Sequence, residues 1–271
     1  IAGFTILLIK RFGLKTQEIF SLISVFIIIL VSIFAFTKTL SNDIFVYSLG
    51  NWKAPFGIVL VLDQFSILMV LVTSLLAFGA LWYAISEGID KKGAHFHPLF
   101  QLQLFGLNGA FLTGDLFNLF VFFEILLLAS YSLLLHAKGE GRVKAGLHYV
   151  VINLVGSTLF LFAVGTLYGI LGTLNIADLS QKVAQLSPEN VNVVASAGLL
   201  LLIVFGLKAA MFPLYFWLPN AYGKTSAPVA ALFAIMTKVG IYSIIRVHGT
   251  IFGQNANELA FYYTPWVLYI G

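Results

Sequence analysis

The sequence contains no cysteine and few charged residues, and both shortages limit the class of protein to which it can belong. Without cysteine there is no disulfide and no thiolate metal site. Only 10% of its 271 residues are charged, whereas a soluble domain carries about 25%. Hydrophobic residues make up 60% of the chain, and the mean hydropathy is +0.98. These values predict a polytopic membrane protein without a soluble domain, and no cleavable signal peptide is visible.

Long apolar runs predict that the membrane part is all-α. Backbone polar groups inside a bilayer must be hydrogen-bonded internally, so runs of about 20 apolar residues form helices. Alternating runs of strand length, which a barrel needs, are absent. We expect a short helix within the polar loop Gly172–Asn192. The expected spans are Ile1–Ile9, Ile19–Thr37, Ile58–Ile85, Pro98–Gly114, Leu116–His136, Val143–Leu171, Val193–Tyr215, Val229–His248 and Leu259–Gly271.

The first and last of these runs are too short for a full span, so we expect the chain to be a piece of a longer protein.

The basic residues of the chain gather in alternate loops. Three lie in the even-numbered loops, or four if Arg246 at the end of a span is included. The positive-inside rule then places the odd-numbered loops in the cytoplasm and the N-terminus outside. The nine in the odd-numbered loops are Lys10, Arg11, Lys15, Lys91, Lys92, Lys138, Arg142, Lys144 and Lys224.

Three ionisable side chains lie near the middle of expected spans: Glu124, Lys208 and Lys238. A charge at that depth costs about 2.5–3.5 kcal/mol on insertion scales, and such residues typically mark ion or proton paths. One Glu and two Lys on three helices therefore suggest a lateral proton relay. The competing interpretations are a protonated Glu124 that only hydrogen-bonds, and a Lys208 that snorkels beside an ordinary proline kink.

Pro213 follows Lys208 by five residues and predicts a broken helix. A proline inside a helix removes one hydrogen bond and clashes with the carbonyl four residues earlier, here that of Ala209. Broken helices line hydrated cavities in transporters. Lys238 lies about 12 residues beyond Ser226, the expected N-cap of the next helix, which also places Lys238 in mid-membrane.

Weaker candidates are His148 and His248, which can titrate near neutral pH and are possible relay members, although interfacial hydrogen bonding is their commoner role. His95 and His97 lie in an expected charged loop, and their spacing is a poor metal signal without further ligands. Asp115 is expected to cap the helix that begins at Leu116. No phosphate-binding loop and no nucleophile–base arrangement is present.

Two segments carry a resemblance to a known family, FQLQLFGLNGAFLTGDLFNLFVFFEILLLASYSLLLH (Phe100–His136) and GLKAAMFPLYFWLPNAYGKTSAPVAALFAIMTKVGIYSIIRVH (Gly206–His248). They resemble the proton-translocating antiporter-like subunits shared by respiratory complex I, membrane-bound hydrogenases and Mrp-type multisubunit cation/proton antiporters. Within this group, the residue pattern is most similar to the D subunit of Mrp Na⁺/H⁺ antiporters. The run GAFLTGDLFNLFVFFEILL is the most specific part.

The resemblance implies a fold of about fourteen helices with two inverted five-helix repeats. Residues 1–97 would hold helices one to three, residues 98–248 the first repeat, and residues 249–271 the truncated start of the second. Glu124 would match the family's fifth-helix Glu, Lys208 the Lys of the broken seventh helix, and Lys238 the Lys of the eighth. Many relatives in complex I carry a Lys where this chain has His148. Two assignments of the cytoplasmic inlet of the relay therefore remain: His148 takes the place of that Lys, or the inlet is formed differently.

The resemblance implies a non-enzymatic antiporter subunit in which protons move along Glu124, Lys208 and Lys238. It implies no cofactor and no nucleic acid. The expected partners are other antiporter subunits, the bilayer of a bacterial-type inner membrane, H⁺, and Na⁺ or another monovalent cation; a metal site is left undecided. One alternative is the pump arm of complex I or a membrane-bound hydrogenase. A second is an inactive scaffold, against which three mid-membrane charges speak.

Overall fold

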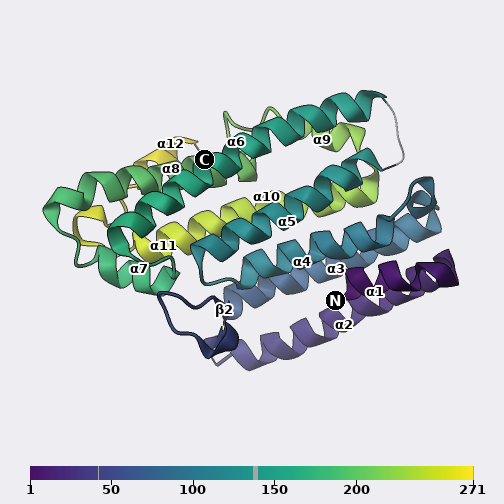
Figure 1. Ribbon diagram of the computed structural model, residues 1–271, viewed down its shortest axis with the longest axis horizontal. Helices are drawn as coiled ribbons and strands as arrows, with labels where there is room; N and C mark the ends of the chain where they lie inside the picture. The colour runs from purple at the N-terminus through teal and green to yellow at the C-terminus, as the bar shows by residue number, and fades with distance from the viewer. Residues whose placement is uncertain (42, 137–139, 271) are drawn as a thin grey trace.

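The computed structural model describes residues 1–41, 43–136 and 140–270, which form a bundle of helices running side by side (Figure 1). Lys138 and Gly271, used in the expectations above, lie outside the described residues. The prediction of an all-α polytopic membrane protein is confirmed. Six helices within the described residues are long and apolar enough to span a membrane, at Leu14–Thr39, Gln64–Ser86, Leu116–Leu135, Gly141–Leu171, Pro188–Ala209 and Ala227–Ile251.

Most helices follow one another with short connections, but a longer one with two strands joins α2 to α3. The helix α7 confirms the short helix expected in the Gly172–Asn192 loop, and α10 continues into a π-helical turn at Ile244–His248. The helix bounds are α1 Ala2–Ile9, α2 Leu14–Thr39, α3 Gln64–Ser86, α4 Phe96–Leu112, α5 Leu116–Leu135, α6 Glu140–Leu171, α7 Ile176–Val183, α8 Val191–Ala209, α9 Leu218–Lys224, α10 Ala227–Ser243, α11 Gly249–Ile251 and α12 Thr264–Ile270.

The third expected span was wrong at its start. Instead of a helix from Ile58, a strand β2 (Val59–Leu62) pairs antiparallel with β1 (Phe45–Ser48), and α3 begins only at Gln64. A capping box fixes this boundary. The Asp63 side chain accepts from the Ser66 amide at 2.8 Å, and the Ser66 hydroxyl accepts from the Asp63 amide at 2.9 Å. The last run differs similarly, because α12 begins at Thr264 rather than Leu259.

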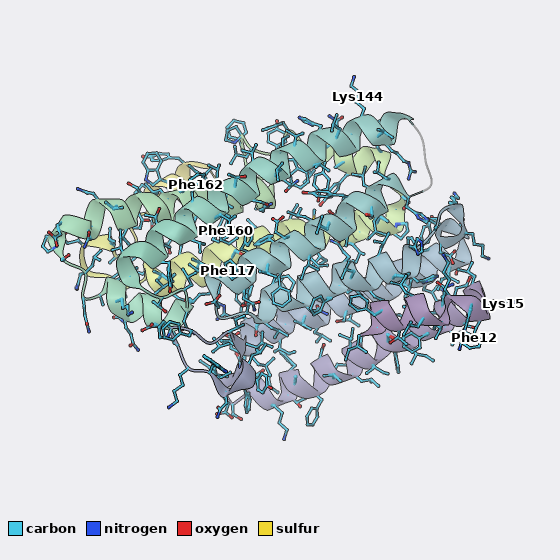
Figure 2. All side chains as sticks on the ribbon, in the orientation of Figure 1. Phe12, Lys15, Phe117, Lys144, Phe160 and Phe162 are labelled. Atoms are coloured by element: carbon cyan, nitrogen blue, oxygen red, sulfur yellow. The ribbon has the colours of Figure 1, made fainter. Side chains whose placement is uncertain are left out.

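Alternate connections lie at the same end of the bundle, as the charge count assumed. The turns between α1 and α2 and between α3 and α4, the end of α5 and the start of α6 gather at one end (Figure 1), towards which Lys15 and Lys144 also lie (Figure 2). The β1–β2 hairpin, α7 and α11 lie at the other end. The basic loops therefore share one side of the bundle.

Glycines allow the closest helix contacts, as in other membrane bundles. A Cβ at Gly106 of α4 would lie 2.7 Å from the Cβ of Leu126 on α5. A Cβ at Gly240 of α10 would lie only 2.5 Å from the backbone nitrogen of Ala209, the last residue of α8. The second contact brings α10 close to the end of α8, next to Lys208.

Candidate functional site

The seventh expected span is broken, but the break begins before Pro213. The helix α8 ends at Ala209, and Ala210 adopts the left-handed conformation with φ 55° and ψ 43°. The chain becomes helical again only at Leu218. The indole of Trp217, which is 1% exposed, donates to the Leu207 carbonyl at 3.0 Å and so satisfies one acceptor at the end of α8. The predicted break is confirmed, and the helical part of the expected span Val193–Tyr215 is corrected to Val191–Ala209.

Lys208 lies in the last turn of α8 and is 3% exposed. Its Nζ donates to the side-chain oxygen of Asn153 at 3.2 Å, to the Asn153 carbonyl at 3.3 Å and to the Ser157 hydroxyl at 3.4 Å. The carbonyl end of a helix carries partial negative charge, which favours a cation there. Breaking the helix after Ala209 thus creates a polar setting for a buried lysine.

Glu124, on α5, is linked to Lys208 through one hydroxyl group, that of Ser157. The Ser157 hydroxyl donates to Oε1 of Glu124 while it accepts from Lys208. Within the described residues, Glu124 and Lys208 make no direct ion pair within 4.0 Å; Ser157 stands between them. The Phe123 ring centroid lies 5.9 Å from the lysine Nζ and supplies a further favourable contact. The partner of Glu124 comes from another helix, since no cationic residue lies within one helical turn of it in the sequence.

Sequence reasoning missed Asn153 and Ser157, although a signal was present. These two residues and Tyr149 recur every four positions and so form one polar stripe on an apolar helix. All three are buried. Gly156 brings this face close to α8, because a Cβ there would lie 2.8 Å from Cδ2 of Leu207 and 3.6 Å from Cε of Lys208.

The structure does not bring the other predicted relay residues to this chain of contacts. Lys238 is exposed on α10 and has no hydrogen-bond or ion-pair partner among the described residues. His148 is exposed on α6, with its ring centroid 5.9 Å from that of Phe216. His248 is fully buried, and its Nε2 lies 2.9 Å from the Gly198 carbonyl oxygen.

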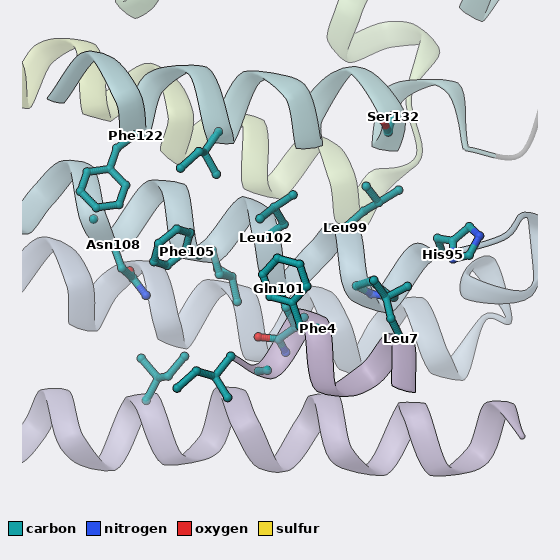
Figure 3. Close-up of a pocket in the computed structure, with 18 of the residues that line it drawn as sticks. Phe4, Leu7, His95, Leu99, Gln101, Leu102, Phe105, Asn108, Phe122 and Ser132 are labelled. Atoms are coloured by element: carbon teal, nitrogen blue, oxygen red, sulfur yellow. The ribbon is translucent and has the colours of Figure 1, made fainter. Parts of the chain in front are cut away.

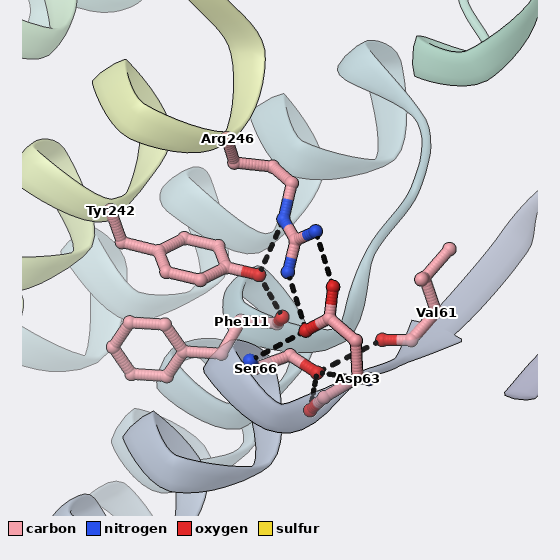
Figure 4. A network of polar contacts seen from close by, with 6 residues as sticks. All are labelled: Val61, Asp63, Ser66, Phe111, Tyr242 and Arg246. Atoms are coloured by element: carbon pink, nitrogen blue, oxygen red, sulfur yellow. Dashed lines mark hydrogen bonds and ion pairs between the residues drawn. The ribbon is translucent and has the colours of Figure 1, made fainter. Parts of the chain in front are cut away.

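A second polar network ties α10 to α3 and α4 (Figure 4). Arg246 binds Asp63 with both terminal nitrogens, at 2.6 and 2.8 Å. Its Nε donates to the Tyr242 hydroxyl at 3.0 Å, which donates to the Phe111 carbonyl at 2.6 Å. Burial acts to raise the pKa of Asp63, but hydrogen bonds from Arg246 and Ser66 outweigh it and hold the pKa below its usual value. No local sequence pattern signals this pairing.

A large cavity lies apart from both networks. It has a volume of about 1170 Å³ and lies between α1, α4 and α5. Its wall is largely apolar, with Leu99, Leu102, Phe105 and Phe122 turned towards it (Figure 3). None of the three predicted relay charges lines it. Among the described residues, no three His, Asp or Glu side chains are grouped as a metal site.

Comparison with known proteins finds a matching family model, described as "NADH:quinone oxidoreductase/Mrp antiporter, TM", over residues 113–269. The D subunit of a probable K(+)/H(+) antiporter of Rhizobium meliloti (strain 1021) is 55% identical over 82% of this chain and 41% of its own length. The D subunit of a Na(+)/H(+) antiporter of Alkalihalophilus pseudofirmus is 44% identical over 94% of this chain and 51% of its own. The chain thus spans about half the length of these relatives.

Solved structures share the fold. A chain of the Mrp complex from Dietzia sp. DQ12-45-1b matches with a TM-score of 0.85 and 34% identity, over 93% of this chain and 46% of that one. A chain of the membrane-bound sulfane sulfur reductase, an archaeal respiratory membrane complex, matches with a TM-score of 0.88 and 29% identity, over 99% and 54%.

Proposed function

Because the chain belongs to the NADH:quinone oxidoreductase/Mrp antiporter transmembrane family, we propose that it is part of the D subunit of a multisubunit cation/proton antiporter and carries protons. The observation that carries this proposal is the buried chain of contacts from Lys208 through Ser157 to Glu124 at a helix break. The relatives named as D subunits of Na⁺/H⁺ and K⁺/H⁺ antiporters support the same activity.

Ser157 is the proton bridge in this proposal. Its hydroxyl oxygen accepts from the Lys208 ammonium, and its own proton is directed at Glu124. A proton that enters at Oγ from Lys208 can be matched by one that leaves for Glu124, so Ser157 stays neutral throughout. When Glu124 is protonated, Lys208 loses the anion that stabilises its ammonium and releases a proton more easily. The pair therefore exchanges one proton without exposing either charge to lipid.

Lys238 is the onward member of the relay. Its exposed position on α10 suits contact with helices outside this chain. The relatives are about twice as long as the chain, so they contain sequence that can supply such helices. We assign residues 98–248 to the first five-helix repeat, residues 1–97 to the helices before it, and residues 249–271 to the start of an inverted second repeat. His248 is buried between α8 and the end of α10 and is a possible relay member, whereas His148 is a candidate for the inlet.

The partners of the chain are other subunits of the antiporter complex, a lipid bilayer, H⁺, and Na⁺ or another monovalent cation. The proposed location is a bacterial-type inner membrane. The basic loops at one end of the bundle face the cytoplasm by the positive-inside rule, with the N-terminus outside. In this orientation, the Asp63–Arg246 network lies on the outer side and Lys144 on the cytoplasmic side.

Lys208→Ala tests the proposal. We expect the variant to abolish cation-driven proton movement in everted membrane vesicles, because no other buried amine reaches Ser157 within the described residues. The complex should still assemble, as measured by copurification of its subunits. Lys144→Ala, at an exposed lysine of α6, is the matched control and should leave antiport unchanged. Normal antiport in an assembled Lys208→Ala complex would refute the relay.

A second candidate function is the pump arm of a redox complex such as complex I or a hydrogenase. It is favoured by the TM-score of 0.88 with the archaeal sulfane sulfur reductase. The same residues would then carry protons, driven by electron transfer elsewhere in the complex. Purification of the intact complex separates the two: partners with iron–sulfur clusters or flavin support the pump arm, and their absence supports the antiporter.

A further inference from the structure

A second group of titratable side chains lies at the basic end of the bundle, away from Glu124 and Lys208. Asp90 lies in the 3₁₀ turn Ile89–Lys92 that follows α3. His97 lies in the first turn of α4, where it is buried rather than in the charged loop that the sequence suggested. The Nε2 of His97 is 3.2 Å from Oδ2 of Asp90, and the two side chains are 1% and 0% exposed.

Each member of this pair has one further polar atom that is buried and unpartnered. Within the described residues, Oδ1 of Asp90 and Nδ1 of His97 have no hydrogen-bond partner. Buried polar atoms are nearly always satisfied, so two unpaired ones at one place indicate a binding role. Apolar and aromatic neighbours such as Phe96, whose ring centroid lies 5.6 Å from that of His97, leave little to compensate a net charge.

From this geometry, we propose that Asp90 and His97 form a proton-binding site distinct from the Glu124–Lys208 relay. The pair is neutral with one shared proton, either as carboxylate and imidazolium or as carboxylic acid and imidazole. Loss of that proton leaves a bare carboxylate, and gain of a second leaves a bare imidazolium. A charge that is buried and unpaired costs far more than the neutral pair. One bound proton is therefore the stable state of the site.

The charged groups around the pair do not supply an alternative counter-charge for Asp90. On α2, the half-buried Glu18 interacts electrostatically with Asp90 but is itself an acid, and Lys15 and Lys91 act on Glu18 in turn. On the C-terminal side of α5, His136 lies with its Nε2 3.0 Å from the Ile89 carbonyl oxygen.

Burial lowers the pKa of His136, and the cation of Arg142 adds to this, against the raising effects of the Ile89 carbonyl and of Asp90. Burial lowers the pKa of His97 as well, against the raising effects of the hydrogen bond and the charge of Asp90. Of the two histidines, His97 is the one in direct contact with the Asp90 carboxylate, at 3.2 Å, and so is the imidazole that balances it. Glu18 is half-buried and interacts with Asp90, so in this proposal it is the group through which a proton reaches the pair from solvent.

Histidine titration by NMR tests the site in the intact complex, reconstituted in lipid nanodiscs with ¹⁵N-labelled histidine. His97→Gln identifies the resonance by its disappearance. Asp90→Asn should lower the midpoint of the His97 titration by about one pH unit or more, because the imidazolium loses its anion. Glu87→Gln, at an exposed carboxylate on the same side, is the matched control and should leave the midpoint in place.

Two outcomes overturn the proposal: an unchanged midpoint in Asp90→Asn, or no change in His97 protonation between about pH 5 and pH 10. If Asp90→Asn does not assemble, Asp90→Glu serves instead: it keeps the carboxylate but displaces it from Nε2 of His97 and should shift the midpoint, with an unchanged midpoint again refuting the site. The Asp90–His97 proposal rests on the proposed function only because the transported ion, H⁺, is also the ion that this site binds. Lys208→Ala should leave the His97 titration unchanged, so failure of either proposal is seen separately.

Discussion

At the scale of single residues, Ser157 decides whether Glu124 and Lys208 act as one unit. It is the only described side chain that hydrogen-bonds to both. Replacing it with alanine leaves a gap that a water can fill only imperfectly, so proton exchange should slow without a loss of fold. We expect Ser157→Ala to lower antiport about tenfold, equivalent to about 1.4 kcal/mol in the barrier. Initial rates in everted vesicles measure this.

Thr158→Ala is the control for that change. Thr158 follows Ser157 on α6, but it is exposed and its hydroxyl bonds only to the Leu154 carbonyl of its own helix. Its loss should leave the antiport rate within about twofold of wild type. Equal rates in Ser157→Ala and wild type would show that Glu124 and Lys208 do not communicate through this hydroxyl.

At the scale of helices, the contact between α10 and the end of α8 depends on Gly240. An added methyl group there would meet the backbone of Ala209, which cannot rotate away as a flexible side chain can. Overpacking of this kind costs about 1–3 kcal/mol. We expect Gly240→Ala to lower the melting temperature of the complex and to reduce antiport, because Ala209 adjoins Lys208. Gly165→Ala on α6, where nothing lies within 4 Å, should change neither.

The Asp63–Arg246 pair fixes α10 to α3, and its contribution depends on pH. The pKa of Asp63 in the fold lies below its unfolded value, so the stability it adds is present at neutral pH and is lost as pH falls through the folded value. Asp63→Asn leaves Arg246 without its anion and should cost about 2–3 kcal/mol at pH 7, below the ~3–5 of a fully buried pair.

Thermal melting of the complex at several pH values checks this expectation. The difference between wild type and Asp63→Asn should be largest at neutral pH and should shrink as the medium becomes acidic. Asp43→Asn, at an exposed carboxylate in the connection between α2 and β1, is the control and should melt like wild type at every pH. A difference that is constant across pH would rule out an electrostatic origin.

The sequence carries information about helix length and capping, but not about strand pairing. The long helices could be predicted because apolar length alone requires them, and α5 begins as expected because Asp115 caps it, accepting from the Asn118 amide at 2.8 Å. The start of α3 could not, because Val59–Leu62 is as apolar as a helix and only its pairing with β1 makes it a strand.

The candidate site was likewise predictable from the sequence only in part. Glu124 and Lys208 were visible as isolated charges in apolar runs. Their bridge through Ser157 was not, because serine is common in membrane helices and only the packing of α6 against α8 selects this one. The Arg246–Asp63 pair joins positions 183 residues apart, and no local pattern carries such information.

At the scale of the whole molecule, orientation in the membrane is the property with the widest consequences. The absence of cysteine makes it directly measurable, since one introduced cysteine is the only thiol in this chain. Lys53 lies between β1 and β2, and Lys92 lies between α3 and α4, at opposite ends of the bundle (Figure 1). Both are exposed.

We expect a membrane-impermeant maleimide to label Lys53→Cys in whole cells and Lys92→Cys only after the membrane is opened, because the positive-inside rule predicts that the basic loops face the cytoplasm. The reverse pattern would invert the bundle and place the Asp90–His97 site on the outer side. The chemistry of both buried centres would survive that result, since neither depends on orientation. Only the direction in which protons approach each of them would change, and with it the side from which Glu18 would be loaded.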